Sequence, residues 1–292
     1  MSHLLSLGTI LDRTWETYQK RFVELMSISG WLLIVAILEV LALLLYPYVT
    51  ELAATATLYT FWESLGVVLF ALTNTLIAPV IGVWVYIALV RFLKTEETNN
   101  PSTAKALKEG WKWFLPHCWV GILIMAVLLA GTLISFLPAG IIGGLTMIWS
   151  APFFIIFLNL FVILGIFVAL ILNFRWSVHY LLAPYALLLD GVRGKAALHE
   201  SRKLVLGRFW QAFIRIVIPK VIFIILGVII MWALAFVVHI LISALVGLNV
   251  DLSLRLQSIS GGLLSLVIAI LINPLVVLAD VIVYRNLKET KS

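Results

Sequence analysis

The sequence predicts an all-α integral membrane protein with six transmembrane helices, arranged as three repeats of an amphipathic interfacial helix and a transmembrane hairpin. Composition, apolar run lengths and internal similarity support this fold class. The chain of 292 residues is 63% hydrophobic and 12% charged, with a mean hydropathy of +1.14. Soluble domains are roughly half apolar and a quarter charged. We therefore expect a single membrane domain over residues 1–292.

Six apolar runs reach the length of about 20 residues that a membrane-spanning helix needs. They cover residues 25–48, 65–92, 119–137, 153–184, 217–246 and 259–284. Between the third and fourth runs, Gly140, Gly143 and Gly144 fit either a tight outer turn or a close contact between helices, and we favour the turn. The fourth run with its extension to Asp190 is too long for one span, so it is expected to break at Pro184. The alternative is a span that ends near Leu172.

Three charged segments that precede pairs of apolar runs resemble one another. Aligning Leu11, Leu107 and Leu198 brings TILDRTWETYQKRFV, KALKEGWKWFLPHCW and AALHESRKLVLGRFW into register, with offsets of 96 and 91 residues. Each segment has apolar residues at helical spacing and charged residues on the opposite side, which is typical of a helix lying at a membrane interface. The sequence therefore predicts repeats over approximately 1–94, 101–190 and 191–288.

A small residue follows the aligned leucine three positions later in every copy. These residues are Thr14, Gly110 and Ser201. Small side chains let helix backbones approach closely. We expect the three amphipathic helices to pack around a common face through these positions, although packing against lipid is the alternative for the first helix.

The Lys and Arg residues divide the connections between runs into two classes. Basic residues lie before the first run, between the second and third, between the fourth and fifth, and after the sixth, whereas the other connections hold only Arg255. Short basic connections stay in the cytoplasm. We therefore expect a plasma-membrane protein with both termini cytoplasmic. Its net charge of +6 would face anionic lipid headgroups, without any need for nucleic acid.

The sequence lacks the motifs that commonly carry chemistry in membrane enzymes. There is no HExxH, GxSxG or CxxC, no glycine-rich phosphate loop and no carboxylate cluster of the DDxxD type. The five histidines are dispersed, and the single cysteine is Cys118. We expect no cofactor, no metal and no enzymatic activity.

Ionisable and amide residues inside apolar runs are the remaining candidates for a functional site. They are Arg175, Asp280, Glu39 and Asn273. An arginine within a span needs a carboxylate partner, for which Asp280 is the first candidate and Glu39 the deeper one. Alternatively, Arg175 belongs to an interfacial belt.

Two blocks of the sequence resemble a known family. The opening LSLGTILDRTWETYQKRF and the central APYALLLDGVRGKAALHESRKLVLGRFW are similar to the hallmark blocks of a bacterial and archaeal membrane family. This family includes the membrane domain attached to some glycerophosphoryl diester phosphodiesterases, and small uncharacterised six-span proteins related to that domain. The matching positions of the second block are Pro184, Gly191, Ala197, Leu198, Ser201, Leu204, Gly207, Arg208, Phe209 and Trp210. Arg202 replaces the usual aromatic residue.

The resemblance implies a six-span fold of prokaryotic type. The phosphodiesterase activity of the longer relatives does not carry over to this sequence, because it contains no phosphodiesterase barrel. The leading hypothesis is a non-enzymatic membrane protein with a structural, regulatory or lipid-handling role and unknown protein partners. The alternative is a small transporter or channel component with a polar site near Arg175, Glu39 and Asp280. A polar cavity where Glu39, Asn74, Asn159, Arg175 and Asn273 converge would favour transport.

Overall fold

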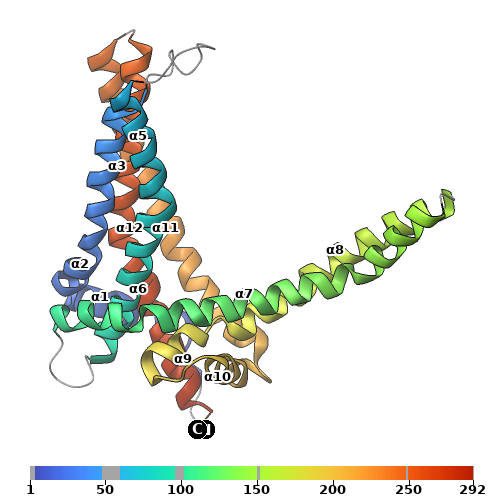
Figure 1. Ribbon diagram of the computed structural model, residues 1–292. Helices are drawn as coiled ribbons and strands as arrows, with labels where there is room; N and C mark the ends of the chain where they lie inside the picture. The colour runs from blue at the N-terminus through green and yellow to red at the C-terminus, as the bar shows by residue number, and fades with distance from the viewer. Residues whose placement is uncertain (1–3, 48–59, 96–101, 150–151, 248, 292) are drawn as a thin grey trace. The chain divides into compact units, whose positions relative to one another are not determined.

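The chain is helical throughout the part that the computed structural model describes, which is residues 4–47, 60–95, 102–149, 152–247 and 249–291 (Figure 1). Within these ranges there is no strand. Six helical segments are long and apolar enough to cross a membrane. They are Phe22–Leu45, Phe61–Lys94, Thr103–Ile148, Pro152–Asp190, Phe209–Val246 and Val250–Glu289. The predicted six-span, all-α fold is confirmed at this level.

The chain forms two compact units. Unit 1 comprises Met1–Phe114 and Arg215–Asn286, and unit 2 comprises Leu115–Ile214 and Leu287–Ser292. The unit boundaries fall within helices α7 (Thr103–Ile148), α11 (Phe209–Val246) and α12 (Val250–Glu289). They therefore do not coincide with the limits of the predicted repeats.

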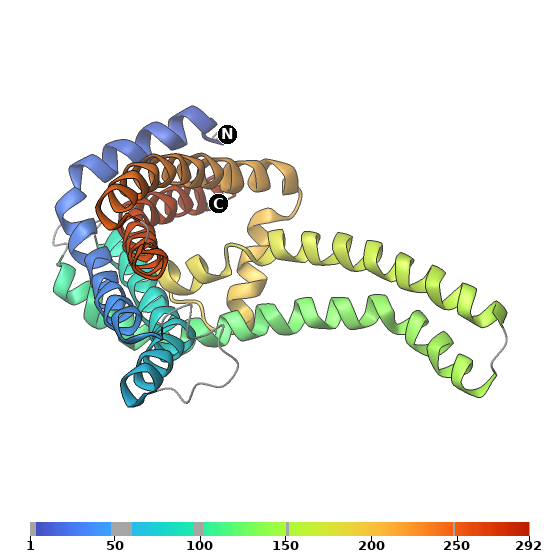
Figure 2. The ribbon, with the colours of Figure 1, turned by 90° about the horizontal axis from the view of Figure 1, so that it is seen from above.

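Unit 1 contains the first two apolar segments, the beginning of α7 and most of α11 and α12. Its remaining elements are α1 (Leu7–Lys20), α2 (Phe22–Ser29), the 3-10 turn η1 (Gly30–Leu32), α3 (Leu33–Leu45), α5 (Phe61–Leu72), the π-helical turn η2 (Thr73–Ile77) and α6 (Ala78–Thr95). Figures 1 and 2 show α3, α5, α6 and α12 side by side. Two helices of unit 1 begin with a polar capping side chain: Ser6 caps α1, and Thr60 forms a capping box with Glu63 in α5.

The core of unit 1 is made of aliphatic side chains packed on glycines. Gly66 in α5 lies so close to the backbone of Leu45 that an added Cβ would be 2.6 Å from its carbonyl carbon. Gly227 in α11 packs in the same way against Ile268 and Ile272 of α12. Small residues allow such close approach of helices in membranes, where packing is the main source of helix association.

The π-helical turn η2 interrupts the second span just before Pro79 in α6. A proline has no backbone N–H and clashes with the preceding turn, so a helix that contains one needs local adjustment. Near η2, Asn74 donates a hydrogen bond to the carbonyl of Phe70, and Thr75 donates one to Ala71. These side chains supply hydrogen bonds to carbonyls of their own helix.

Unit 2 is built on the hairpin of α7 and α8 (Pro152–Tyr180), followed by α9 (Ala183–Asp190), α10 (Lys195–Val205) and the start of α11. The two hairpin helices touch where a Cβ on Gly165 would lie 3.0 Å from the carbonyl oxygen of Ser135. Asn173 also donates a hydrogen bond of 2.9 Å to the Thr132 hydroxyl. Most other apolar side chains of α8 point outward, as expected for a helix in lipid.

The turn predicted over Gly140, Gly143 and Gly144 is wrong, because α7 continues through these glycines to Ile148. α7 also begins at Thr103, so the second amphipathic segment and the third span form one helix of 46 residues. Glycine breaks helices mainly in water. In an apolar surrounding, an unsatisfied backbone group is costlier than the low helix propensity of glycine.

The fourth segment breaks between the two positions considered. α8 ends at Tyr180, and Pro184 lies in the first turn of α9, which begins at Ala183. Proline suits the first turn of a helix because its missing N–H would have no helical partner there. Pro184 therefore starts α9 rather than ending α8.

Candidate functional site

A buried ion pair joins α11 and α12. The Nζ atom of Lys220 lies 2.8 Å from Oδ2 of Asp280, and the Asp280 side chain is only 3% exposed. Low exposure makes the Coulomb attraction strong, but it also makes either charge costly once its partner is removed. Asp280 thus has a cationic partner that the sequence interpretation did not assign to it.

Arg175, the partner expected from the sequence, lies exposed on α8 in unit 2. Its carbonyl accepts a hydrogen bond of 2.6 Å from Nδ1 of His179. Arg175 and Asp280 belong to different units, and their pairing stays a prediction.

Glu39 lies on α3 against a glycine of α12. A Cβ added to Gly262 would be 3.3 Å from the carboxyl group of Glu39, so the two helices approach closely here and a larger residue would require the Glu39 side chain to shift. At the end of α3, Arg255 donates hydrogen bonds to the carbonyls of Leu44 and Tyr46. Glu39 lies seven residues before Tyr46, and Gly262 seven after Arg255. Antiparallel helices therefore place Glu39 about 10 Å below the end of α3.

Glu39 makes no hydrogen bond or ion pair with any residue in the described ranges. Thr73 in η2 lies at about the same level, because Gly66 packs on Leu45 and both helices advance equally from there. Thr73 is fully buried, and its hydroxyl oxygen has no hydrogen-bond partner among the described residues. This level of unit 1 therefore combines a π-helical turn with two polar groups that are not satisfied internally.

The amide residues expected to line a polar cavity are each exposed within their own unit. Asn74 and Asn159 each donate a hydrogen bond to a carbonyl of their own helix, and both are exposed. Asn273 is exposed on α12, whereas Ile272 and Pro274 beside it are buried. The interior of unit 1 beside Asn273 is therefore apolar.

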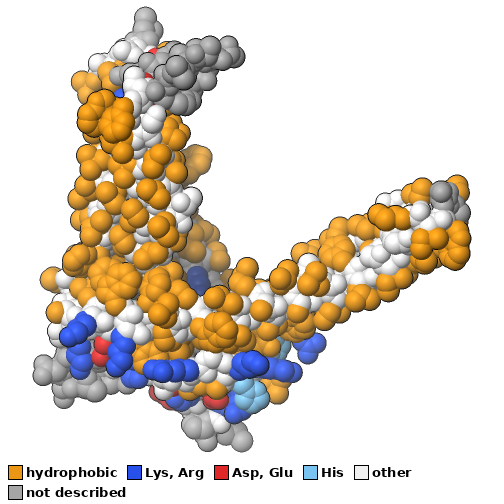
Figure 3. All heavy atoms as spheres, viewed as in Figure 1, with side chains coloured by type: hydrophobic (Ala, Val, Ile, Leu, Met, Phe, Trp, Pro, Cys, Tyr) orange, Lys and Arg blue, Asp and Glu red, His pale blue; other side chains and the backbone are white. Residues whose placement is uncertain are grey.

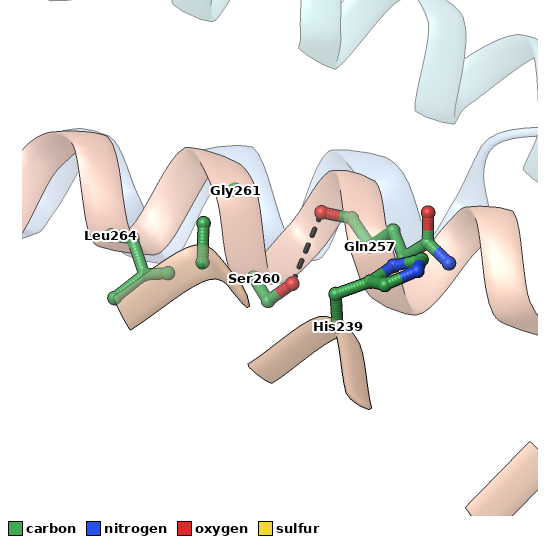
Figure 4. Close-up of a pocket in the computed structure, with 6 residues that line it drawn as sticks. His239, Gln257, Ser260, Gly261 and Leu264 are labelled. Carbon is green, nitrogen blue, oxygen red and sulfur yellow. Dashed lines mark hydrogen bonds between the residues drawn. The ribbon is translucent and has the colours of Figure 1, made fainter. Parts of the chain in front are cut away.

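A small open pocket lies between α11 and α12 on the side where Arg255 is found. Its volume is about 180 Å³, and its lining residues are Ala235, His239, Gln257, Ser260, Gly261 and Leu264. Figure 4 shows the His239 ring beside Gln257, and the Ser260 hydroxyl donating to the Gln257 carbonyl at 3.1 Å. The Gln257 amide donates to Ser253. Ser260 and Gln257 are therefore hydrogen-bonded within α12.

The three predicted contact positions are all buried. Thr14 donates a hydrogen bond to the carbonyl of Ile10 in its own helix. An added Cβ on Gly110 would lie 2.8 Å from the Trp84 ring of α6. The Ser201 hydroxyl donates to the His179 carbonyl at 2.6 Å and accepts from the Leu182 N–H at 3.2 Å.

Each amphipathic segment touches the second long helix of a hairpin from another copy: the last hairpin for α1, and the preceding hairpin for the other two segments. Tyr18 of α1 donates a hydrogen bond to the carbonyl of Leu271 in α12. The indole N–H of Trp84 in α6 donates to the carbonyl of Leu107 in α7. In unit 2, α10 packs on α8 and α9 through Ser201.

Equivalent positions of the three segments also share their exposure. In each copy, the contact residue and the residues four positions before and after it face inward. They are Ile10, Thr14 and Tyr18 in the first copy, Ala106, Gly110 and the half-buried Phe114 in the second, and Ala197, Ser201 and Val205 in the third. The last residue of each aligned segment is exposed and apolar in all three copies: Val23, Trp119 and Trp210. Lys and Arg side chains gather near the ends of the apolar helices in each unit (Figure 3).

Sequence reasoning missed a further ionic cluster in unit 1. Arg91 of α6 is bound to Glu109 of α7, with the Arg91 Nε atom 2.6 Å from a Glu109 carboxylate oxygen. The Arg91 guanidinium also lies over the Trp113 ring, 5.1 Å from its centroid. Spacing in the sequence could have suggested this pair, because Arg91 ends an apolar run and Glu109 lies on the next amphipathic segment.

No known family model matches the chain, and neither a curated protein nor a solved structure shows significant similarity to it. Among the described residues, no group of three His, Cys, Asp or Glu side chains is placed to hold a metal ion.

Proposed function

We propose that this chain is a non-enzymatic integral membrane protein that binds anionic lipid headgroups at the cytoplasmic face and has a structural, regulatory or lipid-handling role. The observation that carries the proposal is the shared pattern of the three amphipathic segments. Each turns one face toward the protein and exposes an apolar residue at its end, close to basic side chains. Such a surface suits the boundary between acyl chains and headgroups.

The proposal includes the three-fold repeat. Support comes from the equivalent buried positions and from the contact of each segment with the second long helix of another copy's hairpin, which is the last hairpin for α1 and the preceding one for the other two segments. The resemblance to the six-span membrane family of prokaryotes agrees with this organisation. The proposal also includes a plasma-membrane location with both termini in the cytoplasm, because the basic residues gather in alternate connections.

The lipid proposal predicts that anionic lipid stabilises the purified protein. We expect a higher midpoint of thermal unfolding in nanodiscs with phosphatidylglycerol than in nanodiscs of phosphatidylcholine alone, because a ligand that binds only the folded state stabilises it. High salt should reduce the difference, since exposed charges are screened. Equal midpoints in the two lipids at low salt would refute the proposal.

The proposed topology makes a second prediction. Reporter fusions after Asn100 and Gly191 should respond as cytoplasmic, and a fusion after Ala54 as external, because basic residues flank the first two sites. Asn100 and Ala54 lie outside the described residues. The opposite response at any of the three positions would contradict this topology.

The second candidate function is a small transporter or channel component. It is favoured by Glu39, whose carboxyl group lies within an apolar span against Gly262. Two observations weigh against a transport function. Asn74 and Asn159 donate hydrogen bonds within their own helices, and Asn273 is exposed. Ion or solute flux into proteoliposomes that depends on Glu39 would replace the lipid-binding proposal with this one.

A further inference from the structure

Three basic residues of unit 2 gather where the end of the chain meets the corner between α10 and α11. They are Lys203, Arg208 and Lys291. Arg208 donates a hydrogen bond of 2.7 Å to the hydroxyl of Thr290, the neighbour of Lys291 in sequence. Lys203 lies on α10, before the corner, and Arg208 follows the corner. We call these three residues the basic cluster.

The backbone holds the basic cluster in place. Ser201 fixes the inner face of α10 through its two hydrogen bonds, so Lys203 points outward. Gly207 then turns the chain with a positive φ of 85°, a conformation that residues with side chains rarely adopt. Arg208 follows directly, and its N–H bonds to the carbonyl of Val205. The sharp corner places a guanidinium beside the last turn of the chain.

Among the described residues, carboxylates balance the positive charges of the basic cluster only in part. Only Lys203 has a carboxylate partner, Glu200 at 3.4 Å, whereas Arg208 and Lys291 form no ion pair within the described ranges. Burial lowers the pKa of Lys291, and the charges of Arg208 and Lys203 lower it further, while Glu200 raises it. Like charges held this close repel one another, and a bound anion would relieve the repulsion.

Exposed apolar side chains adjoin the cluster. Leu206 is 57% exposed and Trp210 is 62% exposed, on either side of Gly207 and Arg208. Trp210 is held in place by ring contacts with Phe174 and Phe213, at centroid distances of 6.2 and 5.8 Å. These apolar groups would not contribute to the binding of a small anion from water. A lipid brings a phosphate and acyl chains together.

We propose that Lys203, Arg208 and Lys291 bind the phosphate of an anionic phospholipid, with its acyl chains lying along Leu206 and Trp210. This inference rests on the proposed function and names its site. The lysine and arginine side chains supply donors and charge to the phosphate oxygens. Leu206 and Trp210 set its depth in the membrane.

The test compares binding of phosphatidylglycerol to the full chain in detergent, measured by native mass spectrometry, for the wild type and the double variant Arg208→Gln/Lys291→Gln. Each basic residue near an anionic headgroup contributes about fivefold, so we expect about thirtyfold weaker binding. The matched control, Lys105→Gln/Lys108→Gln, removes the same charge from exposed sites at the start of α7 and should change binding much less.

Because Arg208 also bonds to Thr290, Lys291→Gln alone provides a second variant with no side-chain hydrogen bond to lose, and it should weaken binding about fivefold. Equal losses in the cluster variant and the control would overturn the site while leaving the proposed function intact. No preference of the wild type for phosphatidylglycerol would refute the proposed function itself. Displacement of the lipid by glycerol 3-phosphate at similar concentration would show that the cluster binds free phosphate compounds, and would overturn the lipid assignment.

Discussion

Replacing Lys220 by Met is expected to lower the free energy of unfolding by about 3–5 kcal/mol, because the change removes the lysine charge that lies 2.8 Å from the buried Asp280 carboxylate. Changing both residues, as Lys220→Met/Asp280→Leu, should cost less than the single change. Two apolar side chains of similar volume remove both charges together, and their packing replaces the pair. Unfolding by chemical denaturant in detergent micelles measures the four free energies of the cycle, which are those of the wild type, Lys220→Met, Asp280→Leu and the double variant.

Lys203→Met is a suitable control for the buried pair. Lys203 pairs with Glu200 at 3.4 Å, but both side chains are exposed, so the loss should be only about 0–1 kcal/mol. Additive losses in the Lys220 and Asp280 cycle would show that the two charges do not stabilise each other. The same cycle with Arg175 in place of Lys220 tests the pairing expected from the sequence, and no coupling there would remove it.

The partner of Asp280 illustrates what the sequence could not specify. Lys220 and Arg175 are both basic residues within or beside apolar runs, and composition alone does not choose between them. The choice depends on which helices pack together and at which level. In unit 1 that level is set by close contacts such as Gly227 against Ile268 and Ile272. Such contacts depend on the three-dimensional packing and leave little trace in local patterns.

Local chemistry was predicted more reliably than packing. Run length alone predicted the six membrane helices, since crossing about 30 Å of hydrocarbon requires a long apolar helix. The glycines of α7 were misread because rules for turns come from chains in water, where a broken helix can bond to solvent. Similarly, Pro184 was expected to end a helix, and it lies instead in the first turn of α9, where its missing N–H has no cost.

The spacing of polar groups along α12 bears on the choice between functions. Gly262, which contacts Glu39, and Asp280 are 18 residues apart, or about 27 Å along a helix. Between them lie buried aliphatic residues that include Ile268, Ile272 and Leu275. A proton or ion would need polar groups or water across this distance. The aliphatic interior therefore supports a structural or lipid-binding role over a conduction path through unit 1.

Replacing Ser201 by Leu is expected to destabilise the protein by about 2–6 kcal/mol. The change leaves the buried N–H of Leu182 without an acceptor, at about 1–3 kcal/mol, and it forces a larger side chain into a closed contact, at about 1–3 kcal/mol more. Ser201→Ala isolates the first effect and should cost about 1–3 kcal/mol.

Gly110, the equivalent position in the second copy, provides a comparison for the destabilisation expected at Ser201. At Gly110 the primary effect is steric, because a new Cβ would meet the Trp84 ring at 2.8 Å, and a shift of that ring would also disturb its hydrogen bond to the Leu107 carbonyl. Gly110→Ala should therefore destabilise, whereas Gly82→Ala in the same unit, with no atom within 4 Å of its added Cβ, should not. Thermal unfolding of the four variants in one detergent makes the measurement. If Gly110→Ala and Ser201→Ala were both as stable as the wild type, these positions would not be helix contacts, and the buried faces of the repeats would lose their role in packing.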